Sequence, residues 1–255
     1  MGIDIGTGTS KGIIIKDNEL VVYHSLPSGI KYEAAANKLA EQLLGKAGIS
    51  MDNIDFTVAT GHGSASVTYS NQRFSDIRCC AKGIHRIFPE ARTIIDIEGQ
   101  TTQVIRLGKK GQIANFTTSE KCASGSGRFL DIISNVLQIP IEDIGKLSLK
   151  SRDPVTFTTA CAVFGESEAV SRIAEGVHSE DILAGVHKAM ADKINTMIEQ
   201  IGLEEYCSIC GGGGLNIGLI KTLEDVLQLK LLVPPQPHIV TAFGAALFAK
   251  ETGDT

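Results

Sequence analysis

The sequence lacks an excess of positive charge, a long apolar run and a basic leader segment. Its 255 residues carry 24 basic and 29 acidic side chains, for a net charge of −5. That balance excludes a nucleic-acid binder that works by bulk electrostatic attraction. No apolar run approaches the roughly 18 residues that a membrane-spanning helix needs. Residues 1–6 have the pattern of a strand and loop rather than of a signal peptide. We therefore expect a soluble, cytoplasmic protein that binds neither nucleic acid nor a membrane.

Glycine and cysteine are the residue types whose numbers stand out. Hydrophobic residues make up 43% and charged residues 21% of the chain, which excludes wholesale disorder. Glycine accounts for 27 residues and cysteine for 6, whereas the usual glycine fraction is about 7%. A reducing cytoplasm disfavours structural disulfides. The thiols are therefore candidate metal ligands, redox groups or simple core residues.

Apolar residues at helical spacing predict several helices between short apolar strands. The clearest helix covers residues 179–201, with Ser179 as its expected N-cap and Gly202 as its stop. The other predicted helices cover residues 33–47, 127–137, 161–174 and 242–250. Strands mixed with helices indicate the α/β class.

Two segments of the chain, residues 2–19 and 94–111, share one pattern. Each has a strand that carries an aspartate, Asp4 or Asp96, followed by a Gly/Thr-rich turn, a second strand and a hairpin turn. We interpret this similarity as an internal duplication.

Three glycine-rich turns have a composition that suits phosphate. They follow Asp4, Asp96 and the apolar residues at 208–209. Glycines let backbone N–H groups approach an anion, hydroxyls donate to phosphate oxygens, and an aspartate can hold Mg²⁺. A Walker loop and a Gly-x-Gly-x-x-Gly pattern are both absent from the sequence. From the residues alone, tight hairpins and a flexible hinge remain the alternatives.

Two of the six cysteines, Cys122 and Cys161, lie just before predicted helices. The partial positive charge of a helix N-terminus favours a thiolate. An iron–sulfur cluster typically takes four thiolates, so two chains related by a two-fold axis would together complete one cluster. Taken alone, the residues favour the alternative of two buried cysteines that cap helices. We interpret the remaining four, Cys79, Cys80, Cys207 and Cys210, as core residues. The Cys207-x-x-Cys210 spacing is also typical of metal and redox sites, so a second metal site remains the alternative for this pair.

The two aspartate turns and the glycine cluster at residues 210–216 resemble the phosphate-1, phosphate-2 and adenosine motifs of the actin, Hsp70 and sugar-kinase (ASKHA) superfamily. The resemblance implies two ribonuclease-H-like domains with ATP in the interdomain cleft, and it would explain the duplication. It places domain I at residues 1–90, completed by a C-terminal helix within 240–255. Domain II, with the cluster cysteines, then covers residues 91–239.

A more specific resemblance covers residues 2–249 and depends on residues 121–130, 161–168 and the first phosphate turn. The chain is similar to the BadF/BadG/BcrA/BcrD-type ATPases, which include the activators of 2-hydroxyacyl-CoA dehydratases. The resemblance implies one oxygen-sensitive [4Fe–4S] cluster per dimer, held by Cys122 and Cys161 of two identical chains or of a chain and a sister subunit. It also implies an ATPase that takes electrons from a ferredoxin or flavodoxin and passes them to an acceptor iron–sulfur enzyme.

The same resemblance implies roles within the ATP site. Asp4 and Asp96 would hold Mg²⁺, and Gln100 would orient the attacking water. The residues expected around ATP or ADP are Gly6, Thr7, Gly8, Thr9, Ser10, Lys11, Gly99, Thr101, Glu166, Gly212, Gly213 and Asn216.

The second phosphate turn departs from the activators' pattern, Asp-x-Gly-Gly-Gln-Asp. Here Glu98 replaces the first glycine and Thr101 replaces the second acid. A carboxylate in this turn would repel phosphates unless Mg²⁺ or a base lies between them. The expected acceptor is therefore a 2-hydroxyacyl-CoA dehydratase, a benzoyl-CoA reductase or a double-cubane-cluster protein. The alternatives are a small-molecule kinase of the same superfamily, with Asp96 as its base, and a non-redox ATP-binding module.

Overall fold

The computed structural model describes residues 1–17, 19–119, 125–157 and 162–253, and its chain divides into two compact units. Unit 1 consists of Met1–Ala91, Leu107–Ile113 and Pro234–Thr255, and unit 2 of Arg92–Arg106 and Ala114–Val233. No helix within the described ranges is long and apolar enough to cross a bilayer.

Unit 1 is built on a five-stranded sheet with the strand order β3-β2-β1-β4-β5. The first three strands form antiparallel pairs, whereas β4 runs parallel to β1 and β5 parallel to β4. These strands are β1 (Gly2–Ile5), β2 (Thr9–Lys16), β3 (Glu19–Pro27), β4 (Val58–Thr60) and β5 (Gln72–Arg73).

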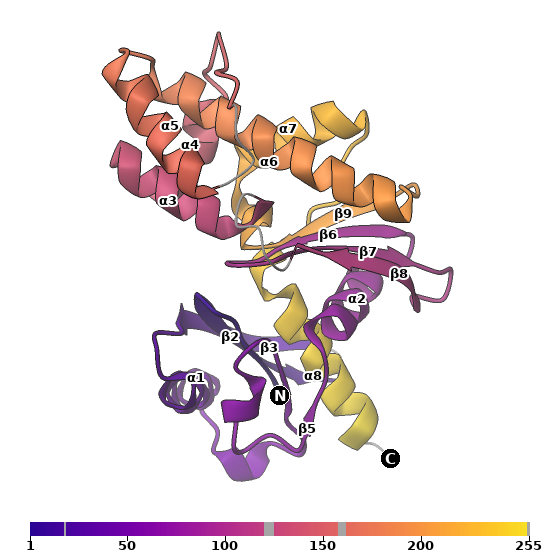
Figure 1. Ribbon diagram of the computed structural model, residues 1–255. Helices are drawn as coiled ribbons and strands as arrows, with labels where there is room; N and C mark the ends of the chain where they lie inside the picture. Colours follow the sequence, from indigo (N-terminus) through magenta and orange to yellow (C-terminus); the bar gives the residue numbers. More distant parts are fainter. Residues whose placement is uncertain (18, 120–124, 158–161, 254–255) are drawn as a thin grey trace. The chain divides into compact units, whose positions relative to one another are not determined.

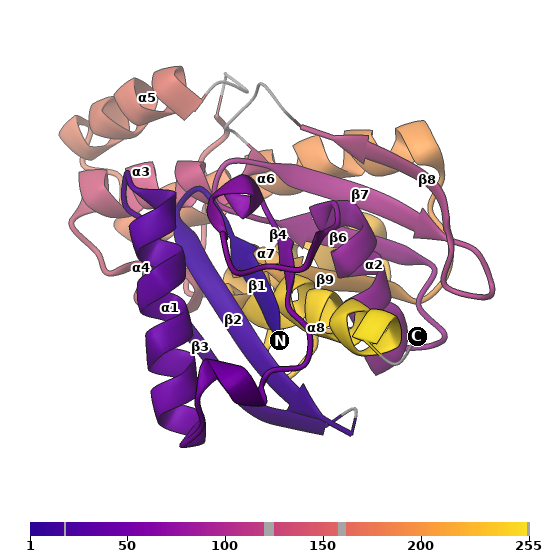
Figure 2. The same cartoon turned by 90° about the horizontal axis from the view of Figure 1, so that it is seen from below.

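Two helices, α1 (Tyr32–Ala47) and α8 (Val240–Gly253), pack on opposite faces of this sheet (Figure 2). Glycines allow the close approach on each face. A Cβ atom on Gly12 would overlap the side chain of Leu43 of α1, and one on Gly2 would overlap the backbone of Ala242 and Ala246 of α8. The other helices of unit 1 are α2 (Asp76–Ile87), which packs against α8, and the 3₁₀ helices η1 (Met51–Asn53), η2 (Ser64–Ser66) and η5 (Pro237–Ile239).

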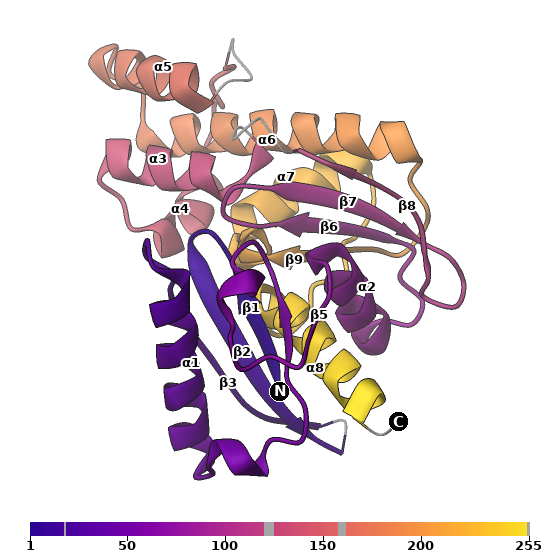
Figure 3. The ribbon, with the colours of Figure 1, turned by 60° about the horizontal axis from the view of Figure 1, so that its bottom comes forward.

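Unit 2 contains a four-stranded sheet with the order β8-β7-β6-β9 (Figure 3). The strands are β6 (Thr93–Ile97), β7 (Thr102–Leu107), β8 (Ile113–Thr118) and β9 (Cys207–Gly211). β7 is antiparallel to β6, and β9 is parallel to it. The first four strands of unit 1 have the same arrangement. Three consecutive strands are linked by hairpins, and the fourth strand pairs in parallel with the first. The predicted α/β class is confirmed, and the repeated topology agrees with the predicted duplication.

The helices of unit 2 gather on one side of its sheet (Figure 1). They are α3 (Gly127–Leu137), α4 (Ile141–Ser148), α5 (Ala162–Ala174), α6 (Ser179–Ile201), α7 (Ile217–Leu227) and the 3₁₀ helix η4 (Gly212–Leu215). Buried apolar side chains of β6, β7, α3 and α6 form one core. Burial of this apolar surface is the main stabilising contribution.

The helices predicted from periodicity are present, but the N-terminus of α6 differs in one detail. Ser179 is the first helical residue, and His178 occupies the N-cap position without a side-chain cap bond. The backbone gives the reason: the carbonyl of His178, in an extended conformation, accepts the N–H of Asp181 at 3.0 Å. The prediction that Ser179 is the cap is therefore wrong.

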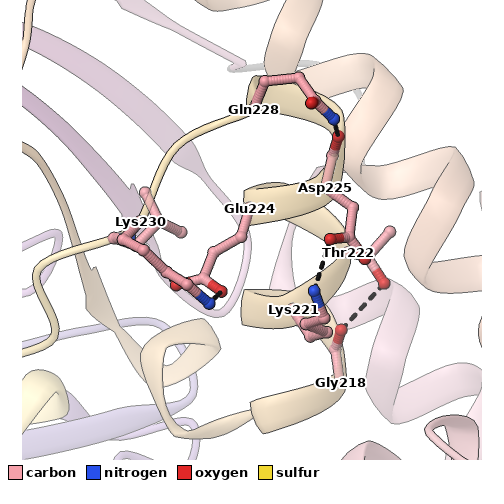
Figure 4. Close-up of polar contacts among 8 residues, drawn as sticks. Gly218, Lys221, Thr222, Glu224, Asp225, Gln228 and Lys230 are labelled. Carbon is pink, nitrogen blue, oxygen red and sulfur yellow. Dashed lines mark hydrogen bonds and ion pairs between the residues drawn. The ribbon is translucent and has the colours of Figure 1, made fainter.

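The C-terminal end of α7 is held by Glu224 (Figure 4). Its carboxylate accepts the backbone N–H of Leu231 at 3.1 Å and pairs with Lys230 at 2.7 Å. The next residue, Leu232, forms a parallel bridge with Ser208 of β9. Glu224 thus helps to fix the segment that borders β9 and the third glycine turn.

Candidate nucleotide and cluster sites

The first phosphate turn connects β1 to β2, and it is held by a residue that the sequence analysis missed. The hydroxyl of Ser28 donates to the carbonyl of Gly6 at 2.6 Å and lies 2.8 Å from the hydroxyl of Ser10. The Ser28 N–H donates to the carbonyl of Gly8 at 3.0 Å. Ser28 follows β3 and reaches the turn only through strand pairing, so no local sequence signal identifies it.

The predicted phosphate-binding residues of this turn separate into two groups. Thr7 is partly exposed, Gly8 and Thr9 are exposed, and a Cβ atom on Gly8 would meet no atom within 4 Å. Ser10 is fully buried, and a Cβ atom on Gly6 would lie 2.7 Å from the carbonyl oxygen of Thr9. Residues 7–9 therefore offer accessible groups, whereas Gly6 and Ser10 shape the turn.

Asp4 and Lys11 form a buried ion pair at the base of this turn. The Lys11 ammonium lies 3.3 Å from a carboxylate oxygen of Asp4, and each residue is only 3% exposed. Antiparallel pairing of β1 with β2 places the two residues opposite each other. The charge of Lys11 is thus already engaged by Asp4.

The second phosphate turn joins β6 to β7 and also holds the start of α3. The N–H of Glu98 donates to the carbonyl of Thr101 at 2.9 Å, which closes the turn. The carbonyls of Glu98 and Gly99 then accept the N–H groups of Gly127 and Arg128, at 2.9 and 2.7 Å. Two direct backbone bonds therefore connect this turn to the first residues of α3.

Asp96 lies buried at the end of β6 beside Cys210 of β9. The thiol of Cys210 donates to Oδ1 of Asp96 across 3.6 Å, and both residues are 1% exposed or less. Parallel pairing of β6 with β9 brings them into register. Cys210 lies in the core, as predicted, whereas its contact with the predicted magnesium ligand Asp96 was not predicted. Gln100, in the adjoining turn, is exposed.

The third glycine turn has one open glycine and one that is needed for packing. A Cβ atom on Gly212 would meet nothing within 4 Å, whereas one on Gly213 would lie 2.6 Å from Cβ of Ile97. The side chain of Asn216 caps α7 by accepting the N–H of Leu219 at 3.0 Å. It also donates to Nε2 of the buried His187 at 3.1 Å. The Asn216 side chain is thus engaged in structural bonds.

The predicted cluster ligands, Cys122 and Cys161, lie outside the described residues. The other four cysteines, Cys79, Cys80, Cys207 and Cys210, are all buried. Burial raises the pKa of Cys79 and of Cys207 to about 12. Without a bound metal, both thiols therefore keep their protons near neutral pH.

Helix α5 begins directly after Cys161 and carries exposed apolar side chains. Phe164 is 66%, Val170 52% and Ile173 42% exposed. Glu166 is also exposed on this helix. Exposed apolar side chains that gather on one element are a feature of protein–protein contact surfaces.

Comparison with known proteins gives one consistent result. The family described as the BadF/BadG/BcrA/BcrD ATPase family matches residues 1–249. The 2-hydroxyisocaproyl-CoA dehydratase activator of Clostridioides difficile is 34% identical over 249 residues, which cover 98% of this chain and 94% of the relative. The (R)-2-hydroxyglutaryl-CoA dehydratase activating ATPase of Acidaminococcus fermentans is 35% identical over 251 residues, which cover 98% of this chain and 96% of the relative.

A solved structure gives the same result for the fold. The activator of the 2-hydroxyisocaproyl-CoA dehydratase from Clostridium difficile with bound ADPNP has a TM-score of 0.95 and 33% sequence identity to this chain. The similarity covers 99% of this chain and 94% of that one.

Proposed function

The chain belongs to the BadF/BadG/BcrA/BcrD ATPase family, and from this premise we propose that it is an ATP-driven electron donor to a partner iron–sulfur enzyme. A 2-hydroxyacyl-CoA dehydratase is the first candidate partner, because the relatives are named activators of such enzymes. One observation carries the proposal. The second phosphate turn accepts the N–H groups of Gly127 and Arg128, so it holds the helix that follows Cys122.

We assign ATP to the three glycine turns, with Mg²⁺ bound near Asp4 and Asp96. Both carboxylates are buried, where a divalent cation would stabilise their charge. When bound, Mg²⁺ neutralises charge on the transferred phosphoryl group. Gln100 is an exposed residue of the second turn, and we assign to it the orientation of the attacking water. We assign direct contacts with the nucleotide to the accessible turn residues Thr7, Gly8, Thr9 and Gly212. The residues that we assign to supporting the turns are Gly6, Ser10, Lys11, Gly99, Thr101, Gly213 and Asn216. We assign Glu166 to the rim of the nucleotide site.

The cluster is assigned to Cys122 and Cys161 of two chains. When bound, it stores the electron that is passed to the partner enzyme. The burial of Cys79, Cys80, Cys207 and Cys210 supports this choice, since none of these four thiols is accessible to a second chain. The exposed apolar side chains of Phe164, Val170 and Ile173 support a second copy, or a sister subunit, as the neighbour of α5. In this proposal, the predicted domains I (residues 1–90 and the C-terminal helix) and II (residues 91–239) each contribute one aspartate turn to ATP binding.

ATP acts in this proposal through its different affinity for two conformations of the chain. A nucleotide with equal affinity for both conformations would shift nothing, however tightly it bound. The bonds from Glu98 and Gly99 to α3 provide the route by which a change in the turn reaches this helix. The electron itself comes from a ferredoxin or flavodoxin.

Iron analysis after purification without oxygen tests this proposal. We expect about four iron atoms per two chains, together with ATP hydrolysis that increases when the acceptor is present. Cys122→Ala and Cys161→Ala should each abolish the iron content, whereas Cys207→Ala, which alters a buried thiol in β9, should retain it. Undiminished iron in Cys122→Ala would refute the cluster assignment. ATP-dependent phosphorylation of a small molecule by a metal-free monomer would instead favour a kinase.

A further inference from the structure

We infer that Thr102 is the positioning residue that connects the second phosphate turn to Cys122. The inference rests on the proposed function and adds a specific element to it. Thr102 is the first residue of β7 and follows the turn directly. Two of its hydrogen bonds reach Ser119 and Gly125, on either side of the segment that contains Cys122.

The first bond uses the main chain and the second uses the side chain of the same residue. The N–H of Ser119 donates to the carbonyl of Thr102 at 2.8 Å. The hydroxyl of Thr102 donates to the carbonyl of Gly125 at 2.5 Å. Ser119 precedes Cys122 and Gly125 follows it, so one residue holds both ends of the segment.

The surroundings of Thr102 make this connection rigid. The residue is fully buried, and its backbone is paired with Ile97 of β6, next to Asp96. A buried hydroxyl that has lost its acceptor is costly, so the bond to Gly125 persists in the folded state. A displacement of the turn therefore moves Thr102, and with it both ends of the Cys122 segment.

A bond of this kind can also be purely structural, and Thr93 provides the comparison. Thr93 is a fully buried threonine of β6, in the same sheet. Its hydroxyl lies 3.0 Å from both the carbonyl and the N–H of Glu204. Thr93→Val and Thr102→Val thus remove the same group from similar environments. Only the second variant affects residues that flank Cys122.

The test measures the electron paramagnetic resonance spectrum of the dithionite-reduced protein with ADP and with a non-hydrolysable ATP analogue. We expect the wild-type spectrum to change with the nucleotide. Thr102→Val should lose this change, or lose the iron, while ADP affinity stays within about threefold of wild type. Thr102→Ser, which keeps the hydroxyl, should behave as the wild type, and so should Thr93→Val.

The outcomes separate the inference from the proposed function. A wild-type protein without iron would refute the proposed function itself. A wild-type protein with iron and a nucleotide-dependent spectrum, combined with an unchanged Thr102→Val, would overturn the inference alone. A Thr102→Ser variant that behaves like Thr102→Val would also overturn it, because the hydroxyl would then not be the group that matters. If Thr102→Val does not fold, Thr102→Ala removes the same hydroxyl without the branched side chain, and the same criteria apply.

Discussion

A Cβ atom on Gly211 would lie 2.7 Å from the carboxylate oxygen Oδ1 of Asp96. Unit 1 repeats this relationship, because a Cβ atom on Gly61 would overlap Oδ1 of Asp4. Gly61 directly follows β4 and Gly211 is the last residue of β9, the two strands that pair in parallel with the aspartate strands. Each glycine has a positive φ, +83° for Gly61 and +75° for Gly211. The duplication thus includes the glycine that leaves room for the carboxylate.

Gly211→Ala should impair ATP hydrolysis more than its effect on stability would suggest. The backbone of Gly211, with φ of 75° and ψ of −173°, belongs to a region that is essentially open to glycine only, at a cost of about 1–3 kcal/mol for other residues. The added methyl group must also displace the carboxylate of Asp96. Misplacement of a catalytic group by about 1 Å can lower a rate on the order of 100-fold. Steady-state ATPase assays and urea unfolding measure the two effects.

Gly176→Ala is the control for that experiment. Gly176 has φ of +80° in unit 2, and a Cβ atom there would meet nothing within 4 Å. This variant should show the backbone strain without a change in ATPase rate. Equal ATPase rates in the Gly176 and Gly211 variants, after correction for the folded fraction, would contradict the role of Gly211 beside Asp96.

Lys11→Met should destabilise unit 1 strongly. The side chains of Lys11 and Asp4 are only 4% and 5% exposed, and removal of one partner of a buried ion pair typically costs about 3–5 kcal/mol. The double variant Asp4→Asn/Lys11→Met should lose less, since it leaves no uncompensated charge. Lys82→Met, which breaks the more exposed pair with Glu251, should change stability by about 1 kcal/mol or less. If urea unfolding gave the same loss of unfolding free energy for Lys11→Met and Lys82→Met, this prediction would be wrong.

Ser28→Ala should loosen the first phosphate turn. It removes a hydroxyl that bonds to Gly6 and Ser10, for an expected loss of about 1–3 kcal/mol where a buried partner is left unsatisfied. ADP affinity, measured by calorimetry, should fall as well. Ser70→Ala, which removes a hydroxyl bond to Val67 in another turn of unit 1, should leave ADP affinity unchanged. Unaltered affinity in the Ser28 variant would show that the turn keeps its shape without that hydroxyl.

Local features of the sequence predicted much of the fold. Helix periodicity predicted the boundaries of α1, α3, α5, α6 and α8 within a few residues, because apolar spacing and terminal glycines such as Gly48 act locally. No boundaries were predicted for α2, α4 and α7. The α6 cap was missed by one residue, because the extended backbone that precedes the helix ends at His178 and Ser179 is already helical. Such a choice depends on the loop that precedes the helix.

The contacts within the candidate site were largely beyond sequence analysis. Ser28, Gly61 and Cys210 reach the aspartate turns through strand pairing, far along the chain from their partners. Gly61 comes directly after β4 and Gly211 ends β9, yet the two sequences around these glycines share little else. The pairing of β1 with β4 and of β6 with β9 joins strands far apart in the sequence, and no local turn sets their register.

Acid should destabilise the protein through His187, over a window that the pKa of this residue defines. Burial lowers the pKa of His187 from 6.5 to about 4. Its Nε2 accepts a hydrogen bond from Asn216, so the neutral ring carries its proton on Nδ1. Below pH 6.5 the unfolded chain binds a proton at this position that the folded chain excludes. Stability is therefore complete above pH 6.5 and falls as the pH decreases toward 4, by up to about 3 kcal/mol.

His187→Gln should flatten this dependence, and the comparison separates the histidine from the carboxylates. Glutamine does not titrate, and its side-chain oxygen can accept the same bond from Asn216. Asp181 titrates in the fold for a different reason: hydrogen bonds from Ser151 and from the backbone of residues 152–153 lower the pKa of its carboxyl group. Its stabilising contribution is lost only as the pH falls below the usual value of 3.8. Urea unfolding between pH 7 and pH 4 should thus show a smaller loss of stability for His187→Gln than for the wild type. Parallel curves for the two proteins would mean that His187 does not control the pH dependence in this range.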